Sequence, residues 1–370
     1  MVEAARVEVW RHVDAGEVAQ ALGPAQLGDH FVRNAVHTGS LRPPPPSSSV
    51  YPLMPIHPLA VVDPQAEVHP EATVGPFCYV RGRVRLAAGV ELVSHASVYG
   101  RATIGAGTRI FPGAVVGSDP QDLKYKGEDS EVVIGERCRI HECVTISRGT
   151  ATGAMITKVG DDVLVMAYAH VAHDCEVGNG VIIANGAQLA GHCRIGRKSI
   201  VGAMVGMHHF VTVGDLTIIS AMCGVRFDVP PYVMAEGNPA EPRSINVIGL
   251  RRDGICETEV ADLREAFRDL YHDRGATPLR EAVEEVRDRF SSKVGSPTLK
   301  LCDWIESHLE NAIKGRMAEA HRTAVVGGKA NTGATKAVVC QQCGKEFQTQ
   351  VRAEAYLAAC THCGRQQLVG

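Results

Sequence analysis

The chain has 370 residues, more than one ordinary core holds, so its length indicates two or three structural units. Its net charge of −3 is close to balance, which argues against nucleic acid as a partner of the main domain. No apolar run is long enough to span a bilayer, and the N-terminus lacks the apolar stretch of a secretion signal. We therefore expect a cytoplasmic protein without a membrane span.

Residues 1–53 form the first segment, and they end near the stretch LRPPPPSSS at positions 41–49. Consecutive prolines favour a stiff, extended chain, whereas serines make it flexible. We expect a weakly structured extension and linker that precedes the main domain.

From Ile56 onward an aliphatic residue recurs at every sixth position as far as Val116. The same spacing returns at residues 134–146 and, after a slip of one residue, runs from Val159 to Val225. A helix repeats near 3.6 residues and a strand at two, so neither explains this period. Three such repeats close one triangular coil, and coils stack about 4.8 Å apart. The sequence predicts a mainly β protein, a parallel β-helix of hexapeptide repeats over residues 54–232.

Two interruptions of the period and one proline pair mark the irregular parts of this coil. The stretches SDPQDLKYKGEDSE (118–131) and SRGTATGAMITK (147–158) do not fit the repeat and are expected to project as loops. Proline cannot donate a hydrogen bond to a strand ladder, so Pro230 and Pro231 are expected to end the coil.

Histidines gather at one corner of the predicted coil. Residues 18 apart lie above one another, which aligns His173, Gly191 and His209, and the neighbouring positions are His170, His192 and His208. A neutral imidazole beside a carboxylate, here Asp174, is suited to taking a proton from a hydroxyl. The N–H of Gly191 is placed to stabilise an oxyanion. Three of the histidines, His170, His173 and His192, could instead hold zinc, as in carbonic anhydrases built on such a coil. The residues alone leave both possibilities open.

After Ile255 the apolar spacing becomes helical. Apolar faces follow Val260–Leu270, Leu279–Phe290 and Leu301–Leu309, and Thr277-Pro278 and Ser296-Pro297 are typical helix starts. We expect a small α-helical domain at residues 233–322 and a flexible linker at 323–337.

The last segment, residues 338–370, has the cysteine spacing of a zinc ribbon. Cys340-x2-Cys343 is followed after sixteen residues by Cys360-x2-Cys363. Four thiolates at this spacing predict a structural zinc ion that the small ribbon needs for folding.

Six stretches resemble the UDP-N-acetylglucosamine O-acyltransferase family and occur in the family's order. They are DPQDLKYKGE (119–128), HECVTISRGT (141–150), AHVAHDCEVGN (169–179), ANGAQLAGH (184–192), DVPPYVMAEGNP (228–239) and INVIGLRRDGI (245–255). The resemblance implies a left-handed coil, a homotrimer and no cofactor for catalysis. It also implies transfer of an (R)-3-hydroxyacyl group from acyl carrier protein to the 3-hydroxyl of UDP-N-acetylglucosamine, the first step of lipid A biosynthesis.

The resemblance also implies roles for single residues. His173 is expected to be the general base, oriented by Asp174, with Gly191 as the oxyanion donor. The residues expected to contact the substrates are Asp122, Lys124, His170, His192, His208, Asn246 and Arg252. The residues expected to determine acyl-chain length are Ala221 and Met222. Ile248 and Asp253 depart from the family, whose members carry an acidic and a basic residue there. The alternatives are a hexapeptide-coil zinc lyase of the carbonic anhydrase type, acylation of a related UDP-amino sugar, and a scaffold that acts through its tail.

Overall fold

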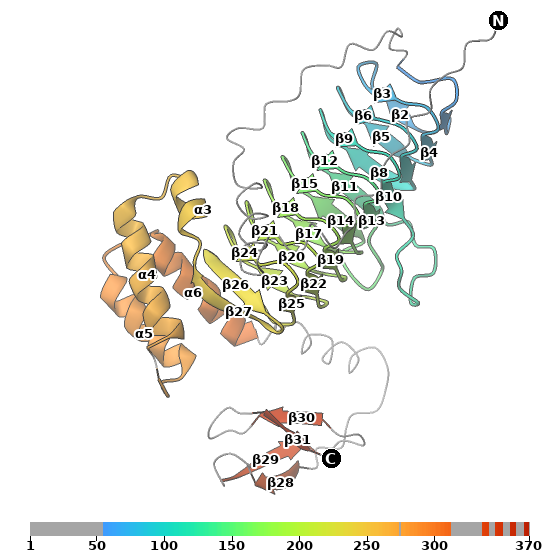
Figure 1. Cartoon of the computed structure of the whole chain (residues 1–370). Helices are drawn as coiled ribbons and strands as arrows, with labels where there is room; N and C mark the ends of the chain where they lie inside the picture. Colours follow the sequence, from blue (N-terminus) through green and yellow to red (C-terminus); the bar gives the residue numbers. More distant parts are fainter. Residues whose placement is uncertain are drawn as a thin grey trace, which may run out of the picture. The chain divides into compact units, whose positions relative to one another are not determined.

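The computed structural model describes residues 55–273, 275–311, 335–339, 345–350, 356–359 and 366–369. Short parallel strands stack into a rod that has three sheets as its sides (Figure 1). The chain visits the first, second and third sheet in turn, and successive coils pair in register, as Ile182 does with Ile200 and Ile183 with Val201. This confirms the predicted mainly β fold of parallel sheets built from six-residue repeats.

As far as β25, the strands of each sheet come from every third position in chain order, and β26 and β27 then extend the third sheet. The first sheet contains β1 (Val61–Val62), β4 (Tyr79–Arg81), β7 (Ser97–Tyr99), β10 (Val115–Ser118), β13 (Thr145–Ser147), β16 (His170–Val171), β19 (Gln188–Leu189), β22 (Gly206–Met207) and β25 (Gly224–Val225). The second contains β2 (Glu67–Val68), β5 (Val84–Leu86), β8 (Arg101–Ile104), β11 (Glu131–Ile134), β14 (Ile156–Val159), β17 (Glu176–Val177), β20 (Arg194–Ile195) and β23 (Thr212–Val213). The third contains β3 (Thr73–Val74), β6 (Glu91–Leu92), β9 (Arg109–Ile110), β12 (Arg139–Ile140), β15 (Leu164–Val165), β18 (Ile182–Ile183), β21 (Ile200–Val201), β24 (Ile218–Ile219), β26 (Val233–Gly237) and β27 (Ala240–Ile245).

The aliphatic residues of the repeat fill the inside of the rod. Ile110, Ile140, Val165 and Ile183, which follow one another in the third sheet, are all 0% exposed. Burying an aliphatic side chain of this size contributes about 1.5–3 kcal/mol. The six-residue period therefore corresponds to one buried anchor for each side of each coil.

Tight turns join the sheets along three edges of the rod. We call the edge between the first and second sheets the first edge, that between the second and third sheets the second edge, and that between the third and first sheets the third edge. Both predicted loops, residues 119–130 and 148–155, leave the rod at the first edge, since they join β10 to β11 and β13 to β14. Turn residues Asp174 and His192 on this edge have φ of 58° and 64°, a left-handed conformation that only a tight turn imposes on such side chains.

The coil does not end at the two prolines, contrary to our expectation. Val229 forms a parallel bridge with Val213, and β26 pairs in parallel with β24 before β27 folds back on it antiparallel. Pro230 and Pro231 lie in the connection between these segments, where no ladder bond is needed from them. The sheet therefore continues beyond the boundary expected at residue 232.

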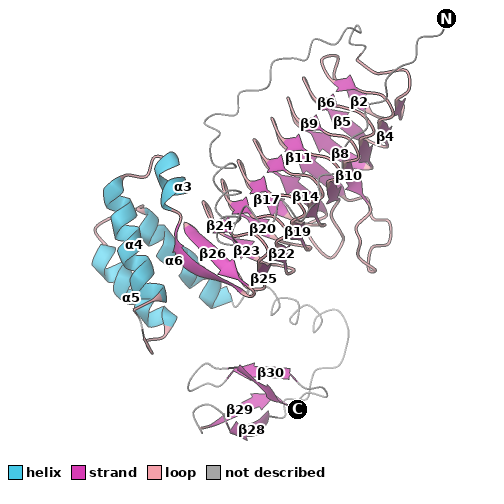
Figure 2. Ribbon diagram, viewed as in Figure 1, coloured by secondary structure: helices cyan, strands magenta, loops and turns pink. Residues whose placement is uncertain are grey.

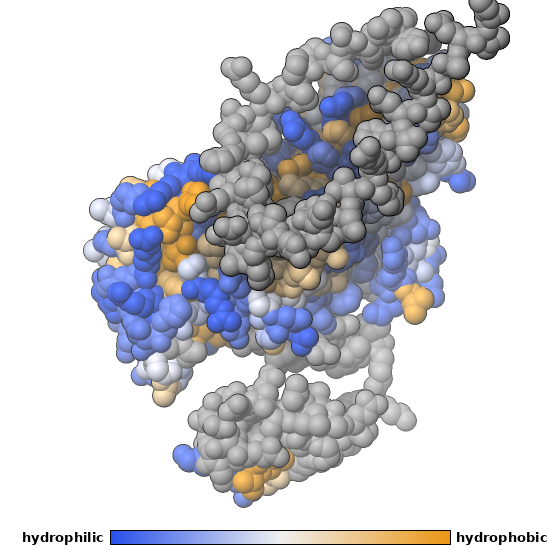
Figure 3. Space-filling view, viewed as in Figure 1, coloured by the Kyte–Doolittle hydropathy of each residue, from blue (hydrophilic) through white to orange (hydrophobic). Residues whose placement is uncertain are grey.

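Among the described residues, four helices follow the hairpin (Figure 2): α3 (Val247–Arg252), α4 (Glu257–Tyr271), α5 (Leu279–Phe290) and α6 (Pro297–Asn311). Leu263, Leu270 and Val283 are 0% exposed and form part of their shared core. Polar side chains cover most of the visible face of this helical segment, with one apolar patch (Figure 3). None of the described helices has the length and apolarity needed to cross a membrane.

The described parts of the tail are two antiparallel strand pairs. β28 (Thr335–Val339) pairs with β29 (Glu346–Gln350), and β30 (Tyr356–Ala359) pairs with β31 (Gln366–Val369). The zinc-ribbon cysteines, Cys340, Cys343, Cys360 and Cys363, lie outside the described residues, as do residues 1–53. The zinc ribbon and the N-terminal linker stay predictions.

Candidate active site

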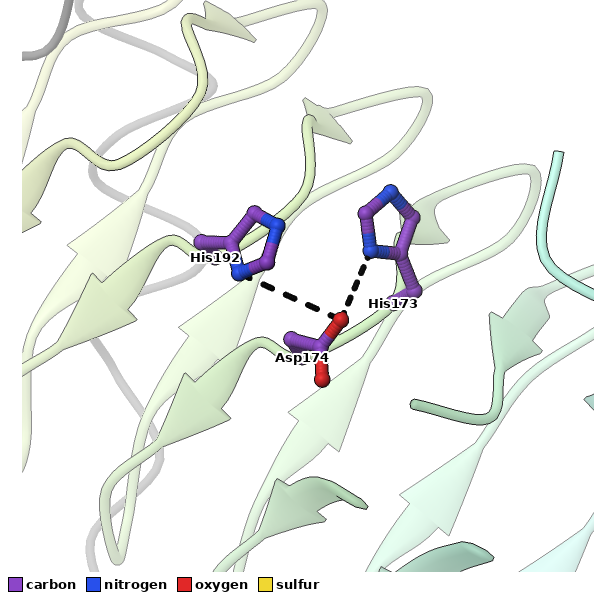
Figure 4. A group of neighbouring side chains, drawn as sticks. All are labelled: His173, Asp174 and His192. Atoms are coloured by element: carbon purple, nitrogen blue, oxygen red, sulfur yellow. Dashed lines mark hydrogen bonds and ion pairs between the residues drawn. The ribbon is translucent and has the colours of Figure 1, made fainter. Parts of the chain in front are cut away.

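His173 and Asp174 are hydrogen-bonded neighbours in the turn that joins β16 to β17, on the first edge (Figure 4). Nδ1 of His173 lies 2.9 Å from Oδ2 of Asp174. An ionised carboxylate can only accept, so Nδ1 carries the hydrogen and Nε2 keeps its lone pair. The two side chains are 9% and 1% exposed, which shields this bond from water. This is the arrangement of a general base and the group that orients it.

Threonines from the neighbouring loop and strand hold Asp174 in place. Thr150 donates its hydroxyl to Oδ2 at 2.6 Å and its backbone N–H to both carboxylate oxygens at 3.1 and 3.2 Å. Thr157 accepts the N–H of Asp174 at 2.8 Å. Burial raises the pKa of Asp174, but the hydrogen bonds from His173 and Thr150 outweigh burial and hold the pKa below its ordinary value. Asp174 is therefore a carboxylate near neutral pH.

Gly191 lies one coil above His173, and only glycine fits there. A Cβ at this position would lie 2.6 Å from Cε1 and 2.7 Å from Nε2 of His173. Among the described residues, the N–H of Gly191 has no hydrogen-bond acceptor. The close approach places this backbone beside the reactive face of the imidazole, where an oxyanion would need a donor.

His192 borders the pair from the next coil. Its ring lies edge-on to that of His173, with centroids 5.0 Å apart, and it stacks on Phe210 at 4.3 Å. Nδ1 of His192 is 3.9 Å from Oδ2 of Asp174 (Figure 4). Two imidazoles thus converge on one carboxylate, and aromatic stacking fixes the orientation of the second.

The loop at residues 119–130 reaches over the same pair. Oδ2 of Asp122 lies 4.0 Å from Nε2 of His173, and the Asp122 side chain is 17% exposed. Lys124 follows on the exposed part of the loop, and its N–H donates to Asp122 Oδ1. The side chain of His173 is only 9% exposed. The loop and the neighbouring coils bury it, so the first edge forms a recess.

A cleft of about 320 Å³ opens here, lined by His170, Gln188 and Gly206 of the first sheet, by the turn residues His173, Gly191 and His209, and by Gln121 of the loop. Nδ1 of His170 lies 2.7 Å from Thr145 Oγ1, and burial lowers the pKa of His170, which favours the neutral imidazole. His208 lies in the same turn as His209, its ring edge-on to that of His209 at 5.3 Å. The first edge thus brings together most of the predicted site.

The remaining predicted residues lie on the other two edges. Asn246 donates to the carbonyl of Leu216 on the second edge, and Arg252 ends α3, which starts there. Ala221 and Met222 lie on the third edge, where Met222 is 79% exposed. Each side of the rod is six residues long, roughly 20 Å of extended chain. Within one chain these residues do not reach the cleft at His173.

One group of described side chains is close enough to hold a metal ion: His173, Asp174 and His192, whose ligand atoms lie within 4.8 Å of one another. His170, one of the three ligands considered from the sequence, is not in this group. Zinc binds nitrogen and oxygen ligands at about 2.0–2.2 Å. In the structure, a metal ion at this edge would therefore have Asp174, and not His170, beside the two imidazoles.

A larger cleft of about 450 Å³ lies between the second sheet and α6, lined by residues such as Glu176, Arg194, Lys300 and Trp304. None of the predicted site residues lines it. Its described charges are mixed, and it contains no imidazole–carboxylate pair. We therefore assign the chemistry to the smaller cleft at the first edge.

Sequence reasoning did not single out Thr150, Thr145, Phe210 or Gln121. Thr150 lies inside the quoted stretch HECVTISRGT, and Gln121 inside DPQDLKYKGE, so family resemblance marked their neighbourhood. Thr145 could have been found from coil geometry, because it pairs directly with His170 across adjacent strands. Phe210 follows His192 by one coil, a spacing that the repeat provides.

Comparison with family models agrees with this geometry. Residues 228–310 match the model described as UDP N-acetylglucosamine O-acyltransferase, domain 2, and residues 156–191 match the bacterial transferase hexapeptide model. Among solved structures, the UDP-N-acetylglucosamine O-acyltransferase from Moraxella catarrhalis is similar, with a TM-score of 0.65 and 35% identity over 69% of this chain and 97% of that one.

Curated relatives named acyl-[acyl-carrier-protein]–UDP-N-acetylglucosamine O-acyltransferase cover the same region. The Mesorhizobium japonicum protein is 56% identical over 62% of this chain and 81% of its own length. The Rhizobium johnstonii protein is 42% identical over 64% of this chain and 86% of its own length. The chain therefore belongs to the UDP-N-acetylglucosamine O-acyltransferase family of enzymes.

Proposed function

We propose that the chain transfers an (R)-3-hydroxyacyl group from acyl carrier protein to the 3-hydroxyl of UDP-N-acetylglucosamine, the first step of lipid A biosynthesis. The observation that carries the proposal is the buried His173–Asp174 pair, which leaves one imidazole nitrogen for proton transfer at a cleft. The relatives' names give the donor and acceptor. The expected cytoplasmic location belongs to the same proposal.

In the proposed reaction Nε2 of His173 takes the proton of the sugar hydroxyl. The hydroxyl oxygen attacks the carbonyl carbon of the thioester. The resulting oxyanion accepts a hydrogen bond from the N–H of Gly191. When the carbon–sulfur bond breaks, the imidazolium returns its proton to the departing thiolate. Asp174 stabilises the imidazolium and keeps the ring in the productive tautomer. A thioester is already activated, so this route uses no cofactor.

The substrate-binding roles that the family resemblance implies are part of the proposal, and several of these residues lie at the first edge. Asp122 and Lys124 belong to the loop beside His173 and are proposed to contact the UDP-sugar, together with His170, His192 and His208. Asn246 and Arg252 are proposed to contact the nucleotide and the phosphopantetheine side. Ala221 and Met222 are proposed to limit the acyl chain.

A homotrimer of left-handed rods is part of the proposal. It is supported by the distribution of the proposed site residues over three edges, too far apart to meet within one chain. Tyr168, Met204 and Met222 are 69%, 66% and 79% exposed along the third edge. An apolar row of this kind is typical of a surface that another molecule covers.

Product analysis tests the reaction. Mass spectrometry of incubations with UDP-N-acetylglucosamine and a mixture of (R)-3-hydroxyacyl carrier proteins should detect a monoacylated UDP-sugar. A UDP-sugar with a 3-amino group in a parallel incubation tests the related amino-sugar acceptor. We expect His173→Ala to lower kcat about 10²–10⁴-fold. Absence of acylated sugar with every donor would reject the proposal.

Metal analysis tests two points: the zinc-lyase alternative and the structural zinc ion proposed for the tail. We propose that Cys340, Cys343, Cys360 and Cys363 hold one structural zinc ion. Cys343→Ser should reduce zinc content and leave acyl transfer measurable. Carbon dioxide hydration that disappears on metal removal and returns with zinc would instead favour the lyase.

A further inference from the structure

Helix α3 is fastened to the rod at both ends. At its start, Asn246 is 4% exposed, donates its side-chain amide to the carbonyl of Leu216 at 2.7 Å and accepts the N–H of Gly249 at 2.9 Å. At its end, the carboxylate of Asp253 contacts the rod. A helix of six residues is too short to be stable alone, so these two anchors hold its orientation together with Leu250, which is 0% exposed.

The anchor at Asp253 is a partly buried carboxylate held by two cations. Arg197 donates to both carboxylate oxygens, at 2.9 and 3.2 Å, and Lys198 donates at 2.5 Å. The Asp253 side chain is 10% exposed, whereas Arg197 and Lys198 are 46% and 55% exposed. Arg197 also contacts Asp215, one coil further along the second edge, at 3.2 Å. Two-point hydrogen bonding of this kind fixes direction as well as distance.

A second bidentate pair nearby has a different character. Arg251 donates to both oxygens of Glu257 at 2.6 and 2.8 Å, but the two side chains are 51% and 68% exposed. This pair joins α3 to the start of α4 and does not reach the rod. Exposed pairs of this type contribute little, so Glu257 serves as a matched control for Asp253.

The outward face of α3 carries Ile248, which is 56% exposed, with Arg251 and Arg252 beside it. A guanidinium next to an apolar side chain suits a phosphate that carries an organic arm, the chemistry of the proposed donor. Small displacements of a binding group are costly, because a shift of about 1 Å can reduce a rate about 100-fold. The orientation of α3 therefore bears directly on donor binding.

We propose that Asp253 is a positioning residue for the acyl donor. Its carboxylate, held by Arg197 and Lys198, fixes the end of α3 and thereby places Arg252 for the donor phosphate. The inference rests on the proposed function, since it takes acyl carrier protein as the donor. It assigns a role to a position at which this chain departs from the family it resembles.

Steady-state kinetics of the full-length enzyme with varied acyl carrier protein test this role. Asp253→Arg places a third cation against Arg197 and Lys198, so we expect the KM for the donor to rise about tenfold, the effect of one lost charged contact. The kcat and the KM for the UDP-sugar should change less than about twofold. Asp253→Asn should give an intermediate rise, and Glu257→Gln should match the wild type.

Charge exchange separates positioning from general stability. The double variant Arg197→Asp/Asp253→Arg restores an opposite-charge pair, and we expect the donor KM to return to within about threefold of the wild type. Thermal melting of each variant reports whether the fold itself has weakened. A donor KM unaffected in Asp253→Arg, or equal losses in kcat and both KM values that the exchange does not repair, would overturn the inference. An inactive wild type would reject the proposed function instead.

Discussion

Charged side chains lie on both the first and the second edge of the rod, but the two edges differ in whether a hydrogen-bonding atom remains available to a ligand. On the second edge, Asp253 meets Arg197 and Lys198, and every member of the cluster contacts an opposite charge. On the first edge, Asp174 is bound by Thr150 and His173, yet His173 still presents Nε2 to the cleft. Different edges of one rod thus carry a charged anchor and, in our proposal, a general base.

The difference lies in the partner of each carboxylate. Cations such as Arg197 have fixed charge, so their contact with Asp253 restrains geometry without changing protonation. An imidazole can gain and lose a proton near neutral pH, so its bond to Asp174 controls where that proton resides. Variants at each edge should therefore affect different properties, namely turnover at the first and binding or stability at the second.

Among variants that keep both members of the His173–Asp174 pair, Gly191→Ala is expected to have the largest effect. The added Cβ would overlap the ring of His173 at 2.6–2.7 Å and force the base out of position. We expect kcat to fall about 100-fold or more, because a displacement of about 1 Å at a reacting group can cost that factor. Activity within threefold of the wild type would break the assignment of the first edge as the reactive one.

Thr150→Val should lower activity less and shift its pH dependence. The Thr150 hydroxyl helps to hold the pKa of Asp174 below its ordinary value, so its removal raises that pKa. The dyad would then lose its carboxylate at a higher pH, moving the acidic limb of the kcat/KM profile upward. A hydrogen bond to a charged group is worth about 1.5–3 kcal/mol, so a loss of roughly ten- to 100-fold is expected. Thr150→Ser, which keeps the hydroxyl, is the matched control.

At the second edge, Asp253→Asn should change stability in a pH-dependent way. The hydrogen bond from Arg197 holds the pKa of Asp253 below its ordinary value, although burial opposes this. A carboxylate whose pKa is lower in the folded than in the unfolded state stabilises the fold at pH values above its unfolded-state pKa. The stabilisation is lost as the pH falls through the folded-state pKa. Urea unfolding should show a loss of about 1–3 kcal/mol at pH 7 and a smaller difference near pH 2. An equal difference at both pH values would contradict the ion pair.

The smallest effect is expected from Arg85→Ala on the outside of the second sheet. Its bridge to Glu67 at 3.0 Å joins side chains that are 67% and 68% exposed. Such pairs contribute about 0–1 kcal/mol, so urea unfolding should hardly change. A loss above about 2 kcal/mol would show that exposed ladder pairs stabilise the rod as much as the partly buried anchor does.

The repeat made the rod and the first edge predictable. A six-residue period has few physical solutions, and vertical alignment follows from it, so His173 and Gly191 could be placed together from their spacing alone. The loops were predictable for the same reason, as places where polar residues occupy the aliphatic positions. The burial of His173 could not be predicted from the sequence, because it depends on how the loop that carries Asp122 folds back over the rod.

The end of the coil and the anchoring of α3 could not be predicted from the sequence. The rule that proline interrupts a ladder is correct for Pro230 and Pro231, but it does not say whether the next residues rejoin the sheet, as Val233–Gly237 do. The Asp253 cluster joins residues more than fifty positions apart, 55 for Lys198 and 56 for Arg197. No local pattern reports such a contact, and charge alone does not distinguish it from exposed pairs.

Both loops of the first edge leave the rod at a turn and return to the next sheet, where β11 and β14 pair in continuous register. The pairing of β10 with β13 shifts by one residue between Val116 and Ser118, just before the chain leaves the rod. The offset of one residue between Ile146 and Val159 is absorbed within residues 148–155. The pairing of the strands before and after each loop therefore does not depend on the length of the loop. Loops that bind new ligands can be inserted or lengthened at these turns during evolution, while the buried aliphatic residues of the repeat keep their spacing.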